Sequence, residues 1–205
     1  DRRKRTPMTS DLQFPLGSVT KTYTAASVMQ AYEKGLIDID KPIAPYVDPI
    51  LQRQNGTTLL ELWNGDRNIS NVTARQLMQM RGGINDYNDT WYFEETINHP
   101  NHDVDPFELL HRIDKKFLHK PGEKWAYASP GYQLLGLALA QVNGAEKWQD
   151  FDQRSVFPAS LRREYNSTTF MQKGWCSQYP KVVHEYANTP YSFSPSIKVT
   201  NYTFF

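Results

Sequence analysis

The sequence predicts an α+β fold in which helices dominate and strands are few. Apolar residues recur at helical spacing in several segments that carry recognisable start and stop signals. Alternating stretches typical of strands, such as residues 36–40, are short and rare, and no repeat or low-complexity block is present. Because these stretches are too few for a self-contained sheet, we expect residues 1–205 to form a single partial domain within a larger unit.

Two helices are expected in the first half of the chain. Residues 18–34 are apolar on several faces and stop at Gly35, so we expect a central helix with a glycine cap. Residues 73–80 start at a capping threonine and stop before a Gly-Gly pair, which predicts a short helix. The three prolines between residues 42 and 49 predict an extended connector between these helices.

Two further helices are expected in the second half. Residues 106–117 form one, and the apolar run 131–142, which stops at Asn143-Gly144, forms the other. Ser129 and Pro130 precede this run, so we expect Ser129 as its N-cap and Pro130 at its first helical position. Beyond about residue 155 the pattern decays into short pieces rich in aromatic residues, proline and serine.

The charge balance and hydropathy exclude several classes of protein. The 23 basic residues nearly cancel the 22 acidic ones, so no overall field favours nucleic acid or an anionic membrane. The longest wholly apolar stretch, residues 134–140, is far shorter than the roughly 20 residues that span a bilayer. The single cysteine, Cys176, has no partner within the chain for a disulfide.

Sites for N-linked glycosylation are unusually frequent. The composition would give about 1.6 Asn-x-Ser/Thr motifs by chance. The chain has six, beginning at Asn55, Asn68, Asn71, Asn88, Asn166 and Asn201. The excess favours a secreted glycoprotein of a eukaryote, and the alternative is that a loop composition rich in Asn and Thr produced the motifs accidentally.

Ser18 and Lys21 form the pair of residues with the clearest chemical meaning. Residues at i and i+3 are neighbours on a helix, so an amine at Lys21 would lie beside a serine hydroxyl and could take its proton. The spacing alone carries little weight, because about 0.7 Ser-x-x-Lys matches are expected by chance and the chain has one. The sequence around the pair must therefore decide.

Three blocks, in order along the chain, resemble the serine β-lactamase-related family, which includes class C β-lactamases, D-alanyl-D-alanine carboxypeptidases and related esterases. The blocks are residues 6–42, with Phe14-x-x-Gly17-Ser18-Val-Thr-Lys21; residues 73–87, ending in Gly-Gly-Ile-x-Asp86-Tyr87; and residues 121–136, with Trp-x-Tyr127-Ala-Ser129. The resemblance covers residues 1–145 well and 146–205 weakly. It implies a β-lactamase/transpeptidase-like α+β fold, of which this chain supplies mainly the helical region and few strands.

The resemblance also implies roles for individual residues. Ser18 is the acylated nucleophile, Lys21 is its partner on the helix, and Tyr127 shares the proton transfers. The implied enzyme is a serine hydrolase that acts on an amide or ester carbonyl of a small-molecule or peptide substrate. The mechanism of this family requires no metal or other cofactor.

Two departures from the family pattern favour a rival hypothesis. Ser129 stands where the family's Tyr-x-Asn motif has asparagine, and a hydroxyl in that substrate-binding position reaches less far than an amide. The family's later Lys-x-Gly or His-x-Gly strand has no match in this sequence. The rival is a catalytically inactive member, or a truncated product, with a binding or scaffold role.

Two other clusters have ordinary explanations. His99, His102 and Asp103 are of metal-ligating types, but Pro100 and the flanking asparagines favour a polar loop. The aromatic run of residues 91–93 could line a substrate cleft, and covering a helical core is the simpler expectation.

Overall fold

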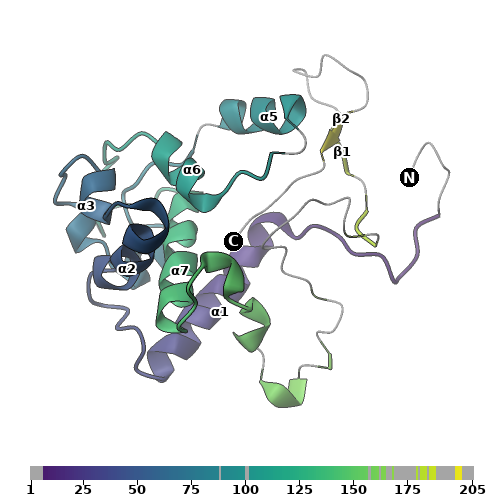
Figure 1. The fold of residues 1–205 in the computed structure, drawn as a ribbon, viewed down its shortest axis with the longest axis horizontal. Coiled ribbons are helices and arrows are strands. Elements are labelled where there is room, and N and C mark those ends of the chain that lie inside the picture. Colours follow the sequence, from purple (N-terminus) through teal and green to yellow (C-terminus); the bar gives the residue numbers. More distant parts are fainter. Residues whose placement is uncertain are drawn as a thin grey trace.

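The computed structural model describes residues 7–87, 89–99, 102–156, 158–161, 163, 164, 168, 179, 181–183, 185–187 and 197–199. Figure 1 shows a group of helices on one side and a pair of short strands beside α5 on the other. Several features singled out in the sequence lie outside the described residues: Cys176, and the glycosylation motifs at Asn88, Asn166 and Asn201.

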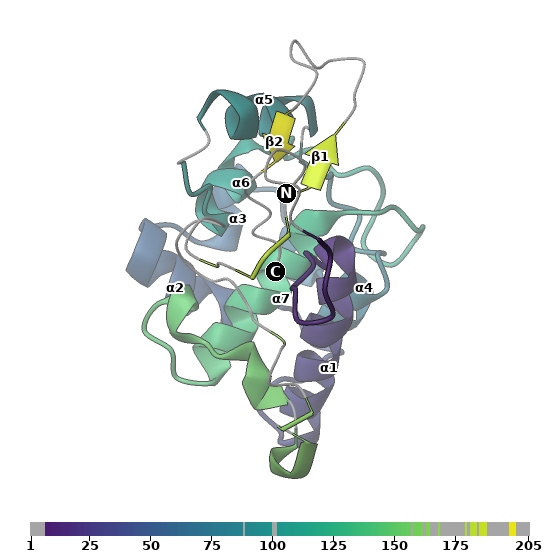
Figure 2. The ribbon, with the colours of Figure 1, turned by 90° about the vertical axis from the view of Figure 1, so that its right-hand side faces the viewer.

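Helix α7 (Ser129–Val142) is the centre of the helical region. Every residue from Ser129 to Ala140 is buried, and the helices α1, α2, α4 and α6 all pack against it. Figures 1 and 2 show α7 enclosed between α1 and α2. Its run of leucines and alanines is apolar on every side, as is typical of a helix surrounded by others.

Helix α1 (Thr20–Glu33) follows a single 3-10 turn, η1 (Gly17–Val19), and ends as expected at Gly35. Gly35 has a φ of +70°, its N–H donates to Tyr32 O over 2.9 Å, and the Leu36 N–H donates to Ala31 O over 2.9 Å. These two hydrogen bonds form a Schellman motif, which satisfies carbonyl groups at the helix end.

The expectation that this first helix is the central one is wrong. One face of α1 packs on α7 and buries Lys21, Thr24 and Ser27 together with Val28 and Ala31, whereas Met29 and Tyr32 are exposed. The buried face therefore consists largely of small and hydroxyl-bearing side chains. Thr24 and Ser27 donate to the carbonyls of Thr20 and Tyr23, so their hydroxyl groups are satisfied within the helix.

The extended connector predicted from the prolines is a helix instead. α2 (Ala44–Asn55) contains Pro45 in its first turn, where a missing N–H costs no hydrogen bond, and Pro49 further inside. The burial of Val47, Ile50 and Leu51 against the core compensates for the hydrogen bond that Pro49 cannot make. Prolines at these positions do not stop a helix whose apolar face is packed.

Three short helical segments link α2 to the next part of the core. They are α3 (Leu59–Leu62), the 3-10 turn η2 (Ile69–Asn71) and α4 (Ala74–Met78). The threonine cap predicted for the last of them is confirmed, because Thr73 and Gln76 form a capping box. Thr58 and Glu61 form the same motif at α3.

Helices α5 (Asp89–Asn98) and α6 (Pro106–Arg112) lie next to each other in Figure 1. Asp105 caps α6, since its carboxylate accepts a hydrogen bond from Glu108 N. α6 ends five residues before the predicted Phe117. The Lys115 side chain donates to the carbonyls of Leu110, His111 and Ile113, and so satisfies the end of the shorter helix.

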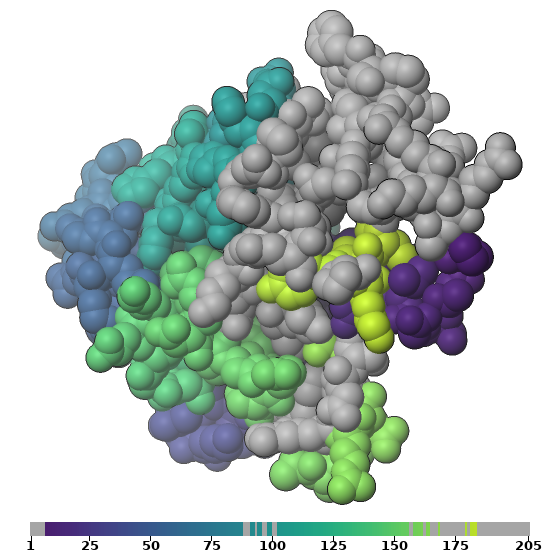
Figure 3. Space-filling view, turned by 45° about the vertical axis from the view of Figure 1, so that its right-hand side comes forward, coloured from purple at the N-terminus to yellow at the C-terminus, as the bar shows by residue number. Residues whose placement is uncertain are grey.

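Strands are few in the described part of the chain, as expected. β1 (Glu185–Ala187) and β2 (Ile197–Val199) pair antiparallel, with Tyr186 opposite Lys198. The N-terminal segment contacts residues 181–183, because Gln13 forms a parallel bridge with Val182, and Figure 3 shows these two segments side by side. The remaining 3-10 turns are η3 (Trp148–Asp150), η4 (Gln153–Val156) and η5 (Ala159–Leu161).

None of the helices in the described residues is long and apolar enough to cross a membrane.

Candidate active site

Ser18 lies in η1, at the point where the chain turns into α1. Gly17 before it has a φ of +53°, in the left-handed region that glycine adopts without strain. The Ser18 side chain is exposed, whereas Lys21, three residues later on α1, is only 6% exposed. The local turn thus presents a hydroxyl to solvent and places an amine behind it.

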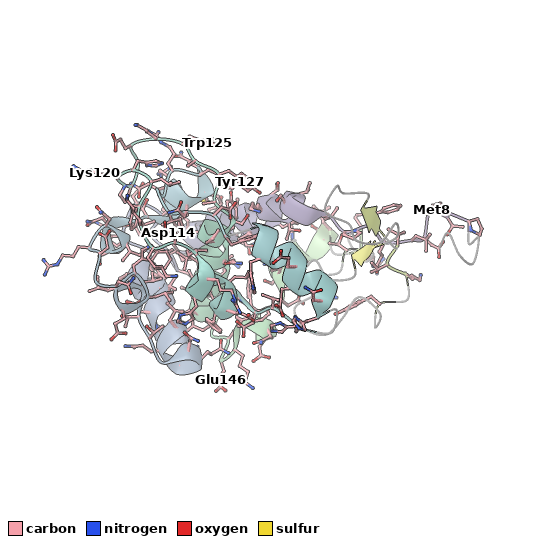
Figure 4. All side chains as sticks on the ribbon, turned by 90° about the horizontal axis from the view of Figure 1, so that it is seen from above. Met8, Asp114, Lys120, Trp125, Tyr127 and Glu146 are labelled. Carbon is pink, nitrogen blue, oxygen red and sulfur yellow. The ribbon has the colours of Figure 1, made fainter. Side chains whose placement is uncertain are left out.

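The structure brings Tyr127 to this pair across 109 residues of sequence. Ser18 Oγ lies 2.7 Å from Tyr127 OH, and Lys21 Nζ donates to Ser18 Oγ over 3.1 Å. Figure 4 shows Tyr127 beside α1. The three residues to which the resemblance assigns nucleophile and proton-transfer roles therefore lie in mutual contact.

Aromatic rings surround the Lys21 amine. Its Nζ lies 5.1 Å from the centre of the Tyr127 ring and 5.9 Å from the centre of the Tyr132 ring. A cation at these distances is attracted by the ring faces, which partly replace the water lost on burial. This arrangement holds the amine in place beside Ser18 Oγ.

Hydrogen bonds to carbonyl groups of residues 78–80 fix the segment that carries Tyr127. The Ala126 N–H donates to Met80 O over 2.9 Å, and Tyr132 OH donates to Met78 O over 2.9 Å. Met80 itself has a φ of +56°, which is uncommon for a residue with a side chain and turns its carbonyl toward Ala126. Loop 78–86 thus forms a support under residues 126–132.

Ser129 lies next to Tyr127 but is not the N-cap that the sequence predicts. Helix α7 starts at Ser129 itself, Ala128 is the N-cap, and no side chain of the cap residue bonds to the helix. The Ser129 N–H donates to Asp86 Oδ1 over 3.0 Å, and the Ser129 side chain helps to lower the pKa of Tyr127. The carboxylate of Asp86 thus replaces the local cap that the sequence predicts.

The electrostatic setting changes the acidity of the Tyr127 phenol. Burial raises the pKa of Tyr127, but hydrogen bonds with Lys21 and Ser18, the positive charge of Lys21 and a hydrogen bond with Ser129 together outweigh burial. The pKa of Tyr127 therefore lies below its ordinary value of 10.0. A lowered pKa increases the fraction of phenolate, the form that can accept the proton of a serine hydroxyl, near neutral pH.

The histidines of the predicted polar loop connect two helices. His102 Nδ1 lies 2.6 Å from Glu95 Oε1 at α5, and His102 Nε2 lies 3.1 Å from Glu108 Oε2 at α6. His99 Nδ1 contacts the same Glu95 oxygen over 2.9 Å. Among the described residues, no group of three or more His, Cys, Asp and Glu side chains is arranged to hold a metal ion.

The aromatic run at residues 91–93 covers the helical region near these histidines. Tyr92 is buried and its ring centre lies 5.4 Å from that of Tyr87, while Trp91 packs beneath the Arg112 guanidinium. Both placements agree with the expected role over a helical core. The sequence gives no comparable hint that Asp86 bonds to the start of α7, because the contact joins residues 43 positions apart.

Comparison with known proteins places these features in a family. The model of the family described as Beta-lactamase matches residues 1–170. Penicillin-binding protein 4* of Bacillus subtilis (strain 168) is 25% identical over 205 residues, which cover 97% of this chain and 41% of that protein. The chain thus spans about two fifths of the length of this relative.

Solved structures with the same fold include a penicillin-binding protein from Bacillus halodurans. Its TM-score is 0.55 at 24% identity, over 73% of this chain and 40% of that one. A D-stereospecific amidohydrolase from a Streptomyces species is 26% identical, with a TM-score of 0.50 over 65% of this chain and 38% of that one. The predicted β-lactamase/transpeptidase-like fold, represented here mainly by helices, is confirmed.

The match over residues 1–170 includes the turn that carries Ser18 and the segment that carries Tyr127. The chain therefore belongs to the Beta-lactamase family, a family of serine hydrolases related to penicillin-binding proteins.

Proposed function

We propose that this chain carries the nucleophile of a serine hydrolase that forms an acyl-enzyme from an amide or ester. The observation that carries the proposal is the contact of Ser18 Oγ with two other groups, Tyr127 OH at 2.7 Å and Lys21 Nζ at 3.1 Å. A serine hydroxyl is a weak nucleophile until a neighbouring group accepts its proton. Both neighbours lie within hydrogen-bond distance, and Ser18 is exposed to an incoming substrate.

In the proposed reaction, Ser18 Oγ attacks the carbonyl carbon while its proton passes to the Tyr127 oxygen, with Lys21 as the partner that shares the proton. The lowered pKa of Tyr127 supports this role. The bond from the carbonyl carbon to the leaving amine or alcohol then breaks, and the leaving group takes the proton. Water attacks the resulting Ser18 ester, releases the acid and returns a proton to Ser18 Oγ.

The substrate is a small molecule or peptide with a reactive carbonyl. A β-lactam, a peptide that ends in D-alanyl-D-alanine and a simple ester all satisfy the proposed chemistry. The 26% identity with a D-stereospecific amidohydrolase supports an amide substrate. Parallel assays with one compound of each class would separate these alternatives.

A binding or scaffold role is the second candidate, and Ser129 is the observation that favours it. Ser129 is buried, with only 7% of the residue exposed. A buried serine is poorly placed to form the hydrogen bond with a substrate amide that a longer side chain would form. In this alternative the family scaffold remains and turnover does not occur.

Covalent labelling tests the proposed function directly. A fluorescent penicillin and a fluorophosphonate are incubated with the chain, and with the full product of its gene where that product is longer. Ser18→Ala should abolish the label, because it removes the attacked oxygen. Ser10→Ala is the matched control, since Ser10 is also exposed and is outside the site.

Ser18-dependent labelling with slow or absent turnover would favour the inactive alternative, because acylation would then be all that the site retains. A label that persists in Ser18→Ala, or no label from either probe in any of these proteins, would overturn the proposed hydrolase.

A further inference from the structure

The start of helix α7 obtains its cap from a distant residue. The first N–H groups of a helix have no partner inside the helix and normally bond to the side chain of the N-cap residue. The N-cap here is Ala128, which has no such side chain, and Pro130 has no N–H. At the first helical position, the Ser129 N–H donates to Asp86 Oδ1 over 3.0 Å.

Asp86 is itself held at the end of loop 78–86. The same Oδ1 accepts the Tyr87 N–H over 3.0 Å, so one carboxylate oxygen joins the loop to α7. The loop also binds the segment before α7, through the hydrogen bond from Ala126 N to Met80 O and the one from Leu118 N to Gly83 O. Ala126, directly before Tyr127, and Ser129, two residues after it, are therefore both tied to this loop.

A chain of contacts leads from Asp86 to the proposed nucleophile. Asp86 accepts from the Ser129 backbone, Tyr127 lies two residues before Ser129 on the same segment, and Tyr127 OH lies 2.7 Å from Ser18 Oγ. Ser129 is buried, so water cannot readily replace the carboxylate as the acceptor of its N–H.

We propose that Asp86 is a positioning residue that sets the Tyr127 hydroxyl against Ser18 Oγ by fixing the first residue of α7. The effect of Asp86 on catalysis rests on the proposed hydrolase function. The effect of Asp86 on the placement of Tyr127 does not. In this proposal Asp86 acts on Tyr127 through Ser129.

A purely structural role would have different effects. A cap that only stabilises α7 would change the unfolding temperature and leave the chemistry of the folded protein unaltered. Asp105 provides the matched control, because its carboxylate caps α6 in the same way, over 2.8 Å to Glu108 N. Asp105→Ala should lower the unfolding temperature without changing the rate of Ser18 labelling or the titration of Tyr127.

The first experiment measures the pH dependence of Ser18 labelling by a fluorophosphonate in Asp86→Ala, Asp86→Asn and Asp105→Ala. We expect Asp86→Ala to slow labelling between about 10- and 100-fold, as is typical when a proton-transfer group is misplaced. Asp86→Asn keeps the accepting oxygen and should label within about threefold of the original chain, since a neutral acceptor still binds an N–H. In a Tyr127→Phe background, Asp86→Ala should have no further effect, because the group that it positions is gone.

The second experiment follows the Tyr127 phenol without any reaction. Its titration is read as the difference in phenolate absorbance between each protein and the same protein with Tyr127→Phe. We expect Asp86→Ala to move the titration of Tyr127 upward, toward that of a free tyrosine, and Asp105→Ala to leave it in place. If neither the original chain nor any variant is labelled at Ser18, the proposed function fails. The Tyr127 titration still tests whether Asp86 positions Tyr127.

Unchanged labelling per folded molecule together with an unchanged Tyr127 titration in Asp86→Ala would overturn the inference. An additive loss in the Tyr127→Phe background would do so as well, because Asp86 would then act independently of Tyr127.

Discussion

Tyr127 OH and Ser18 Oγ lie 2.7 Å apart, although the two residues come from segments separated by most of the described chain. This contact makes the phenol part of the environment of the serine. It also means that deletion of a single oxygen atom, in Tyr127→Phe, removes the contact and leaves the ring.

We expect Tyr127→Phe to reduce the rate of Ser18 labelling by about 10²- to 10⁴-fold, the usual contribution of general acid–base catalysis. Tyr32→Phe is a close control, because Tyr32 and Tyr127 are both 42% exposed and Tyr32 lies at the far end of α1. The measurement is the second-order rate of labelling. Equal rates in the two variants would assign Tyr127 a packing role.

The His102 imidazole, between carboxylates of two helices, predicts a pH-dependent stability. The hydrogen bond with Glu95 raises the pKa of His102 above its ordinary value of 6.5; burial and Arg112 oppose this shift, and the Glu108 and Glu95 charges add to it. A raised pKa in the folded state means that the folded state binds the proton more tightly. The stabilisation is therefore complete below pH 6.5 and disappears as the pH rises through the raised pKa.

Thermal unfolding measured between pH 5.5 and about 8.5, a range in which histidines typically titrate, tests this expectation. The difference in Tm between the original chain and His102→Gln should be largest at the acidic end and shrink toward the alkaline end. His111→Gln is the control, because His111 is exposed and bonds to Asn55, a neutral partner. A constant difference across the range would show that the imidazole acts without its charge.

Gly83 has a backbone environment that excludes any side chain. Its φ is +75°, and a Cβ atom there would lie 2.2 Å from the carbonyl oxygen of His119. Gly35 has a similar φ of +70° with nothing within 4 Å of the same position. Gly83→Ala should therefore destabilise the fold by about 3 kcal/mol or more, against about 1 to 2 kcal/mol for Gly35→Ala, where only backbone strain is added.

Urea unfolding of the two glycine variants measures the difference. Similar losses in both would mean that the 119–120 turn moves away at little cost. A much larger loss in Gly83→Ala would show that loop 78–86 and the turn are held rigidly together.

Asn71 is the motif most open to glycosylation among those in the described residues. Asn71 is exposed at the end of η2, whereas Asn55 and Asn68 are half-buried. After expression in a eukaryotic secretory system, Asn71→Gln should remove one glycan, visible as a shift in electrophoretic mobility that matches treatment with an N-glycosidase. Asn55→Gln is expected to cause no shift, and loss of the glycan only in Asn55→Gln would reverse this assignment.

The sequence predicts best what depends on neighbours along the chain. The helix at α1, its glycine end and the threonine cap of α4 all follow from local rules, and so does the proximity of Ser18 to Lys21. Tyr127 enters the sequence-based site through the family resemblance alone. No spacing rule connects a tyrosine to a serine 109 positions away.

What the sequence does not predict depends on tertiary packing. Pro45 and Pro49 suggest an extended connector, yet burial of the apolar side of α2 makes this segment helical. The Ser129-Pro130 pair suggests a local N-cap, yet Asp86 supplies the acceptor from another loop and the helix starts one residue earlier, at Ser129. In both cases a long-range contact decides between conformations that local signals leave close in energy.

The polar buried face of α1 makes this helix a place where substitutions can raise the stability of the protein. Thr24 and Ser27 are buried, and their hydroxyl groups bond only to carbonyls that α1 already uses. Aliphatic replacements of similar size, such as Thr24→Val and Ser27→Ala, would therefore exchange hydroxyl groups for apolar contacts with α7 without removing a bond that another element needs. Lys21 lies on the same face and cannot be exchanged in this way. A more stable variant of the chain would therefore have to retain this lysine.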